Sequence, residues 1–153
     1  MVVNGDLYNW SYLMMSADKW DFAHMECAKV YAELSHAKRL KVGCVIVRDK
    51  RIISIGYNGM PAGWDNECEF ERDGELYTKP EVLHAETNAL AKVASSNESC
   101  RGAELYCTHS PCLDCAKLIY QAGIVKVFFG EEYQSRDGIE FLLRSGVEVS
   151  RLV

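Results

Sequence analysis

The sequence has no long apolar run, no excess of positive charge and no compositional bias. Without about 20 consecutive apolar residues, no segment predicts a transmembrane helix. The amino terminus, "MVVNGDLYNWSYLMM", lacks a basic region followed by a continuous apolar stretch, so it does not read as a secretory signal peptide. We therefore expect a cytoplasmic protein without a membrane partner.

Lys and Arg total 17 and Asp and Glu total 22, which gives a formal net charge of −5. This balance disfavours a broad nucleic-acid surface, so no nucleic-acid partner is expected. The one local positive excess is "HAKRLK", residues 36–41. Such a run is most often a solvated face, but one phosphate needs only a few local donors. A small anionic ligand therefore stays open.

Apolar residues make up 48% and charged residues 25% of the 153 positions, the mixture of an ordinary globular protein. We predict a single domain over residues 1–153, in which residues 1–18 form an N-terminal extension. The seven cysteines are an odd number, which fits a disulfide framework poorly. In a reducing compartment most of them should be thiols.

Periodicity predicts alternating helices and strands. A helix over 19–35 would bury one side made of Trp20 or Phe22, Ala23, Cys27, Val30, Tyr31 and Leu34. A hairpin follows around "RDKR", and residues 60–80, rich in Gly, Pro and charge, predict a long surface loop.

Further helices are expected over 84–95, after Pro111 and over 136–146, and further strands over 103–109, 125–130 and 147–153. Strands joined by helices usually run parallel, whereas the hairpin must be antiparallel. The sequence therefore predicts an α/β fold with a mixed sheet whose faces are covered by helices.

The segment "LYCTHSPCLDCAKLIYQAGI" contains a closely spaced cysteine pair. Ser110 as N-cap and Pro111 at the first helical position predict a helix start, with Cys112 and Cys115 on one face of its first turn. A helix N-terminus lowers the pKa of a thiol. The pair alone is ambiguous between a disulfide, a thioredoxin-like redox pair and half of a metal site.

The segment "HAETNAL" supplies what a metal site needs, namely His84 as a third ligand and Glu86 as a carboxylate that need not bind the metal. Each taken singly has an ordinary explanation, since a histidine often packs in a core and a glutamate often opens a helix. Three protein ligands leave a fourth position for water, whose pKa zinc lowers to about 7. H-x-E together with P-C-x-x-C is the signature of zinc deaminases that act on nucleobases.

The chain resembles the deoxycytidylate (dCMP) deaminases of the cytidine deaminase superfamily from about Trp20 to Tyr133. The segments that carry the resemblance are "VGCVIV", "RIISIGYNGMPAG", "LHAETNAL" and "LYCTHSPCLDCAKLIYQAGI". The resemblance implies a cytidine-deaminase-like three-layer α/β/α fold around a mixed five-stranded sheet. It also implies zinc-dependent hydrolysis of dCMP to dUMP and ammonia, with dUMP supplied for thymidylate synthesis.

By the same resemblance, Glu86 is the catalytic proton carrier and His84, Cys112 and Cys115 bind one catalytic Zn²⁺. Asn58 would hydrogen-bond the sugar, although Asn-Gly is also a common turn dipeptide. The 5′-phosphate ligands would be Ser35 and Arg39, and the residue closing over the base or sugar would be Tyr133. An exposed loop tyrosine without a role is the alternative for this last position.

Family members are typically homohexamers that dCTP activates and dTTP inhibits. The resemblance implies an allosteric nucleotide site at Gly59, Met60 and Glu67, with Mg²⁺ accompanying the nucleotide, and the loop through Cys68 and Phe70 would complete it. Some members carry a second, structural zinc. Its conceivable ligands are Cys27, Cys68, His24 and His36, but their spacings form no recognised site, and we predict one zinc per chain.

Three other readings share the metal signature. A tRNA adenosine deaminase would want a basic surface, which the net charge opposes. A pterin- or riboflavin-type biosynthetic deaminase fits the metal motif alone. In a non-catalytic zinc-binding module Glu86 would be unnecessary, so its replacement would separate that reading from an enzyme.

Overall fold

The structure, a computed structural model, describes residues 17–152. A five-stranded sheet in the order β2-β1-β5-β6-β7 forms its centre. The strands are β1 (Gly43–Arg48), β2 (Arg51–Tyr57), β5 (Glu104–His109), β6 (Lys126–Glu131) and β7 (Glu148–Arg151). β1 pairs antiparallel with β2 and β5, whereas β5, β6 and β7 run parallel. The predicted mixed sheet is confirmed.

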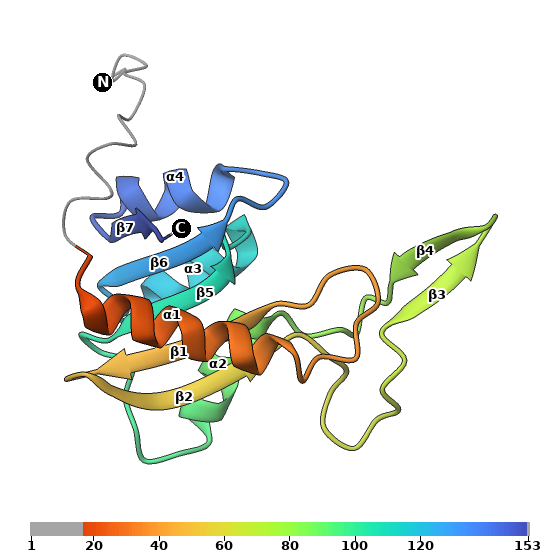
Figure 1. Cartoon of the computed structure of the whole chain (residues 1–153), viewed down its shortest axis with the longest axis horizontal. Coiled ribbons are helices and arrows are strands. Elements are labelled where there is room, and N and C mark those ends of the chain that lie inside the picture. The colour runs from red at the N-terminus through yellow and green to blue at the C-terminus, as the bar shows by residue number, and fades with distance from the viewer. Residues whose placement is uncertain (1–16, 153) are drawn as a thin grey trace.

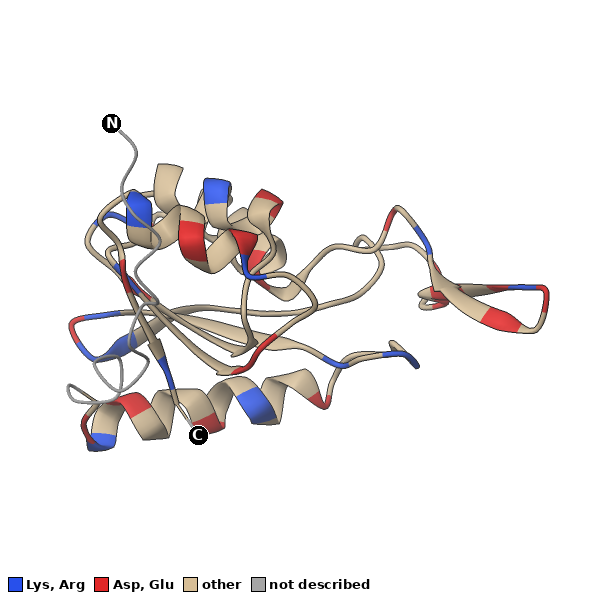
Figure 2. Cartoon of the chain, turned by 90° about the horizontal axis from the view of Figure 1, so that it is seen from above, with Lys and Arg blue, Asp and Glu red and all other residues tan. Residues whose placement is uncertain are grey.

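Helices cover both faces of the sheet and make three layers (Figures 1 and 2). One face carries α1 (Lys19–Ala32), and the other carries α2 (Ala85–Ala94), α3 (Leu113–Gln121) and α4 (Asp137–Arg144). Two apolar clusters result: Met25 and Ala28 of α1 pack with Val45, Tyr106 and Phe128, and the other three helices pack on the opposite strand residues. The alternation of side chains along each strand supplies both clusters from the same strands.

Two glycines allow helices to approach the sheet closely. A Cβ on Gly43 would lie 2.6 Å from the backbone nitrogen of Ala32 in α1. A Cβ on Gly56 would lie 2.6 Å from the backbone nitrogen of Ala89 in α2. Such contacts are too short for any side chain, so these strand positions require glycine.

The predicted buried face of α1 was wrong. Trp20, Phe22, Val30 and Leu34 lie on the outer side, with 41% to 68% of their surface exposed. The buried side consists of Asp21, His24, Met25, Ala28 and Ala32. The close approach to Gly43 leaves room only for alanines at the contact. Asp21 is buried, and its Oδ1 accepts a hydrogen bond from the hydroxyl of Tyr106 at 2.7 Å.

The segment predicted as a surface loop over 60–80 contains a hairpin of its own, β3 (Glu69–Arg72) and β4 (Glu75–Thr78). The strands pair only with each other, and Figure 1 shows them projecting as an arm beyond the end of the main sheet. Asp73-Gly74 form the turn with positive φ angles. Both faces of the arm are largely exposed, so its strands lack the alternation of apolar and polar residues by which a strand is predicted from sequence.

Among residues 17–152, no helix combines the length and apolar character that crossing a bilayer requires. The predicted extension falls almost wholly on residues 1–16, which lie outside the described part of the chain. Asp18, the last residue of that predicted extension, is the N-cap of α1. The single-domain assignment stays a prediction.

Candidate active site

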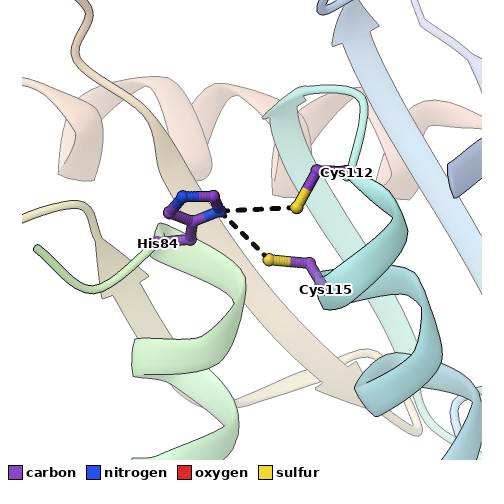
Figure 3. A group of neighbouring side chains, drawn as sticks. All are labelled: His84, Cys112 and Cys115. Carbon is purple, nitrogen blue, oxygen red and sulfur yellow. Dashed lines mark hydrogen bonds between the residues drawn. The ribbon is translucent and has the colours of Figure 1, made fainter. Parts of the chain in front are cut away.

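His84, Cys112 and Cys115 lie together at the end of the sheet where β5 and β6 finish (Figure 3). His84 Nδ1 is 3.3 Å from Cys115 Sγ and 3.6 Å from Cys112 Sγ. All three ligand atoms lie within 4.8 Å of one another. Two segments far apart in sequence are thus brought into one cluster, as their spacing predicts.

The cluster is built on two helix N-termini. His84 is the N-cap of α2 and Cys112 is the N-cap of α3, and neither makes a side-chain capping hydrogen bond. The prediction that Ser110 caps α3 was wrong, because the helix begins two residues later. Ser110 Oγ instead accepts a hydrogen bond from Tyr133 N at 2.8 Å, which joins the two loops beside the cluster.

The three side chains of the cluster shift one another's pKa values. The pKa of Cys112 is lowered to about 4, first by a hydrogen bond from Cys115 and then by one from His84. The pKa of Cys115 is raised because its proton is held by Cys112 and because it is buried. The pKa of His84 is also raised, chiefly by its hydrogen bond with Cys112. Binding of a divalent cation to these three groups would release the protons that they carry.

The geometry fits zinc. Bond lengths of about 2.3 Å to sulfur and about 2.0 Å to nitrogen in a tetrahedron place sulfur and nitrogen about 3.5 Å apart. The two distances from His84 Nδ1 match that edge closely. Three protein ligands leave the fourth tetrahedral position open. Among residues 17–152, no second group of three His, Cys, Asp or Glu side chains gathers as closely.

Glu86 lies in the first turn of α2, two residues after His84. It is buried, with 4% of its surface exposed, yet it borders the cavity beside the cluster. Burial raises the pKa of its carboxyl to about 7. A carboxyl that holds a proton near neutral pH is suited to proton transfer.

A cavity of about 290 Å³ opens in front of the cluster, a size that suits a small ligand. Most of the predicted site residues line it: Arg39, Asn58, His84, Glu86, Cys112 and Tyr133. Asn58 holds the loop before β1, because its Oδ1 accepts from Val42 N and its Nδ2 donates to Leu40 O, both at 2.8 Å. One Nδ2 hydrogen remains available to a ligand.

Five of the predicted residues do not line the cavity: Cys115, Ser35, Gly59, Met60 and Glu67. Ser35 is buried, and its Oγ donates to Asn58 O at 2.7 Å and accepts from Ala37 N at 3.1 Å. Gly59 forms a backbone bridge with Leu83, which joins the end of β2 to the start of the α2 segment. Met60 and Glu67 lie on the loop that leads to the arm. The structure thus gives Ser35 a supporting position behind Asn58.

Sequence reasoning missed several residues that border the cavity. Glu69 and Thr78 come from the arm. His109 is the last residue of β5, and Gln134 lies on the loop after β6. His109 had a signal, because it is the last residue of a strand whose carboxyl end faces the metal motif. Burial lowers its pKa. Glu69 and Thr78 had no signal, since their hairpin was not recognised.

Comparison with known proteins agrees with this geometry. Residues 18–131 match the family described as cytidine and deoxycytidylate deaminase zinc-binding region. That match covers well over half of the sequence. The chain belongs to this deaminase family. Its fold is that of the family, with the mixed sheet between helical layers.

Three relatives illustrate the relationship. The crystal structure of dCMP deaminase from cyanophage S-TIM5 in complex with dCMP and dUMP has 47% identity and a TM-score of 0.84, over 89% of this chain and 98% of that one. ComE operon protein 2 of Bacillus subtilis is 37% identical over 90% of this chain and 74% of its own length. Deoxycytidylate deaminase of Enterobacteria phage T4 is 33% identical over 82% of this chain and 86% of its own length.

Proposed function

We propose that this deaminase hydrolyses dCMP to dUMP and ammonia. The observation that carries the proposal is the cavity in which a zinc-fitting His-Cys-Cys cluster stands beside a buried glutamate. The resemblance to a phage enzyme described with dCMP and dUMP supports this choice of substrate. His84, Cys112 and Cys115 hold the ion, which when bound supplies an activated water as the nucleophile.

Glu86 moves the protons. Its carboxylate accepts a proton from the water that adds to C4 of the cytosine ring. It delivers that proton to N3, the neighbouring ring nitrogen, then takes the remaining proton of the hydroxyl group now bonded to C4 and passes it to the exocyclic amine. The C4–N bond breaks, ammonia leaves, and a carbonyl remains at C4. One carboxyl serves each transfer because it is buried beside the reacting carbon.

The remaining cavity residues bind the nucleotide in this proposal. Asn58 donates its remaining amide hydrogen to the sugar, and Tyr133 closes over the base or sugar. Arg39 binds the 5′-phosphate, and Ser35 acts from behind by holding the loop and Asn58 in place. Figure 2 shows blue Lys and Arg bands on the loop that follows α1, at the end of the molecule from which the arm projects.

The proposal extends to regulation and assembly by family resemblance. The chain would form a homohexamer that dCTP activates and dTTP inhibits, at a site with Gly59, Met60 and Glu67 and with Mg²⁺ accompanying the nucleotide. Its dUMP would feed thymidylate synthesis. All seven cysteines are free, which suits the reducing conditions of the cytoplasm.

An ammonia-release assay tests the substrate directly. The zinc-loaded protein is given dCMP, deoxycytidine, cytidine, dCTP and a tRNA, each with and without added dCTP or dTTP. We expect dCMP to have the highest kcat/KM and dTTP to slow its turnover. Highest activity on the tRNA would favour a tRNA adenosine deaminase instead. If neither dCTP nor dTTP changes the dependence of the rate on dCMP concentration, the proposed regulation is refuted.

A further inference from the structure

The arm formed by β3 and β4 contacts the basic loop of residues 36–41. Both segments extend from the same end of the sheet in Figure 1. Glu69 Oε1 accepts a hydrogen bond from Lys38 N at 2.7 Å and a second one from Arg39 N at 3.1 Å. Two successive backbone N–H groups that point to one oxygen form a small anion nest. The carboxylate of Glu69 therefore fixes the backbone of Arg39.

The side chain of Arg39 is held by the same part of the arm. Its Nη1 donates to Thr78 Oγ1 at 3.1 Å. Glu69 and Thr78 face each other across the hairpin as paired residues. One rung of the arm thus holds both the backbone and the guanidinium of Arg39.

This rung lies at the base of the arm, next to a buried residue. Lys79 N, one residue after Thr78, donates to Cys68 O at 2.8 Å. Cys68, one residue before Glu69, is buried with 1% of its surface exposed. The tip of the hairpin is exposed, so the fixed end is the one that borders the cavity.

The guanidinium of Arg39 keeps its capacity for an anion. In the described part of the chain, no carboxylate forms an ion pair with this side chain. A guanidinium has five N–H donors, and the bond to Thr78 uses one of them. Arg39, Glu69 and Thr78 all border the cavity that Glu86 also borders.

We propose that Glu69, together with Thr78, is a positioning residue that selects a nucleoside monophosphate by holding Arg39 ready for the phosphate. This inference rests on the proposed function, in which Arg39 binds the 5′-phosphate. A free arginine loses much rotamer freedom on binding, and this loss weakens affinity. The rung removes that freedom in advance. The two N–H donors also offset the charge of Glu69, which limits its repulsion of the phosphate.

The test is the ratio of kcat/KM for dCMP to kcat/KM for deoxycytidine. Glu69→Ala should lower this ratio about tenfold, mainly through a higher KM for dCMP, as expected when a hydrogen bond to a charged group is weakened. Glu69→Gln keeps an acceptor oxygen, so its ratio should stay within about threefold of wild type. Thr78→Val, which keeps the shape but removes the acceptor, should lower the ratio by at least about threefold.

Glu71→Ala is the matched control, because Glu71 lies on the same strand, is exposed and pairs with Leu76 away from the loop. Its ratio should equal that of wild type. An unchanged or higher ratio in both Glu69→Ala and Thr78→Val would overturn the inference. If wild type itself shows no preference for dCMP over deoxycytidine, the proposed role of Arg39 is refuted instead. The wild-type ratio thus tests Arg39, and the ratios of the variants test Glu69 and Thr78.

Discussion

At the residue scale, the chemistry of the site depends on which atoms are free to react. His84 and the two cysteines point at one another, so their lone pairs converge on one position (Figure 3). Glu86 stands outside that group of ligands, although it is only two residues from His84. Substitution can therefore separate the proposed metal ligands from the proposed proton carrier.

Glu86→Gln should keep the fold and a full equivalent of zinc while kcat falls by about 10²- to 10⁴-fold, the range typical of a lost general acid or base. The amide has nearly the shape of the carboxyl but cannot carry the proton. Steady-state kinetics with dCMP and elemental analysis measure the two properties. A near wild-type rate would show that the proton path does not run through Glu86.

Cys112→Ala and Cys115→Ala should each lose zinc and activity together, because two ligands hold the ion weakly. The controls are Cys27→Ala, half-buried like Cys112, and Cys100→Ala, buried like Cys115. Both control variants should retain one zinc per chain by elemental analysis. A full metal equivalent in either ligand variant would refute the assigned ligand set.

At the element scale, α2 carries both His84 and Glu86, so the way α2 packs on the sheet sets the position of the site. The closest contact is at Gly56 of β2, where the backbone of α2 lies so near the strand that no side chain would fit. Across the sheet, Gly56 is followed by Cys44 and Cys107, two small buried residues. Small residues in this row let the first turn of α2 lie low against the strands.

Gly56→Ala should lower the free energy of unfolding by about 3 kcal/mol, the upper part of the range for overpacking, because the clash is with backbone rather than with a movable side chain. Chemical denaturation gives this value. Gly59→Ala is the control, since a Cβ there meets nothing within 4 Å. Equal stability of the two variants would mean that α2 can move away from the sheet at little cost.

At the scale of the whole molecule, the metal would join parts that the chain leaves far apart. His84 opens α2 beside β2, and the cysteines open α3 after β5. An ion between them ties these two helices together at one end of the sheet. Binding that occurs only in the folded state stabilises that state.

Removal of zinc by a chelator should therefore abolish deamination and lower Tm by about 10 °C, which corresponds to the stabilisation from zinc at about 1,000 times its Kd. Adding zinc back should restore both. Scanning calorimetry and elemental analysis of the loaded protein give the shift and the stoichiometry, which should be one zinc per chain. Two equivalents per chain, or an unchanged Tm, would contradict this prediction.

The sequence by itself determined the features that depend on short stretches of chain. Each strand of the main sheet has a β-branched or apolar run, and each helix has its own period, so these elements were predicted with small errors at their ends. The metal cluster was also predictable, because His84 and the cysteine pair belong to two short motifs. Their residue types specify the chemistry wherever the motifs meet.

Only the tertiary structure decided which residues those elements bury and which distant segments meet. Where α1 passes close over Gly43 its buried side carries alanines, whereas Trp20 and Val30 lie on its outer face. Ser110 does not cap α3, since it bonds the loop of Tyr133 instead. Glu69 reaches Arg39 from 30 residues away in sequence. Such contacts depend on the mutual fit of whole elements, and a local pattern carries no information about that fit.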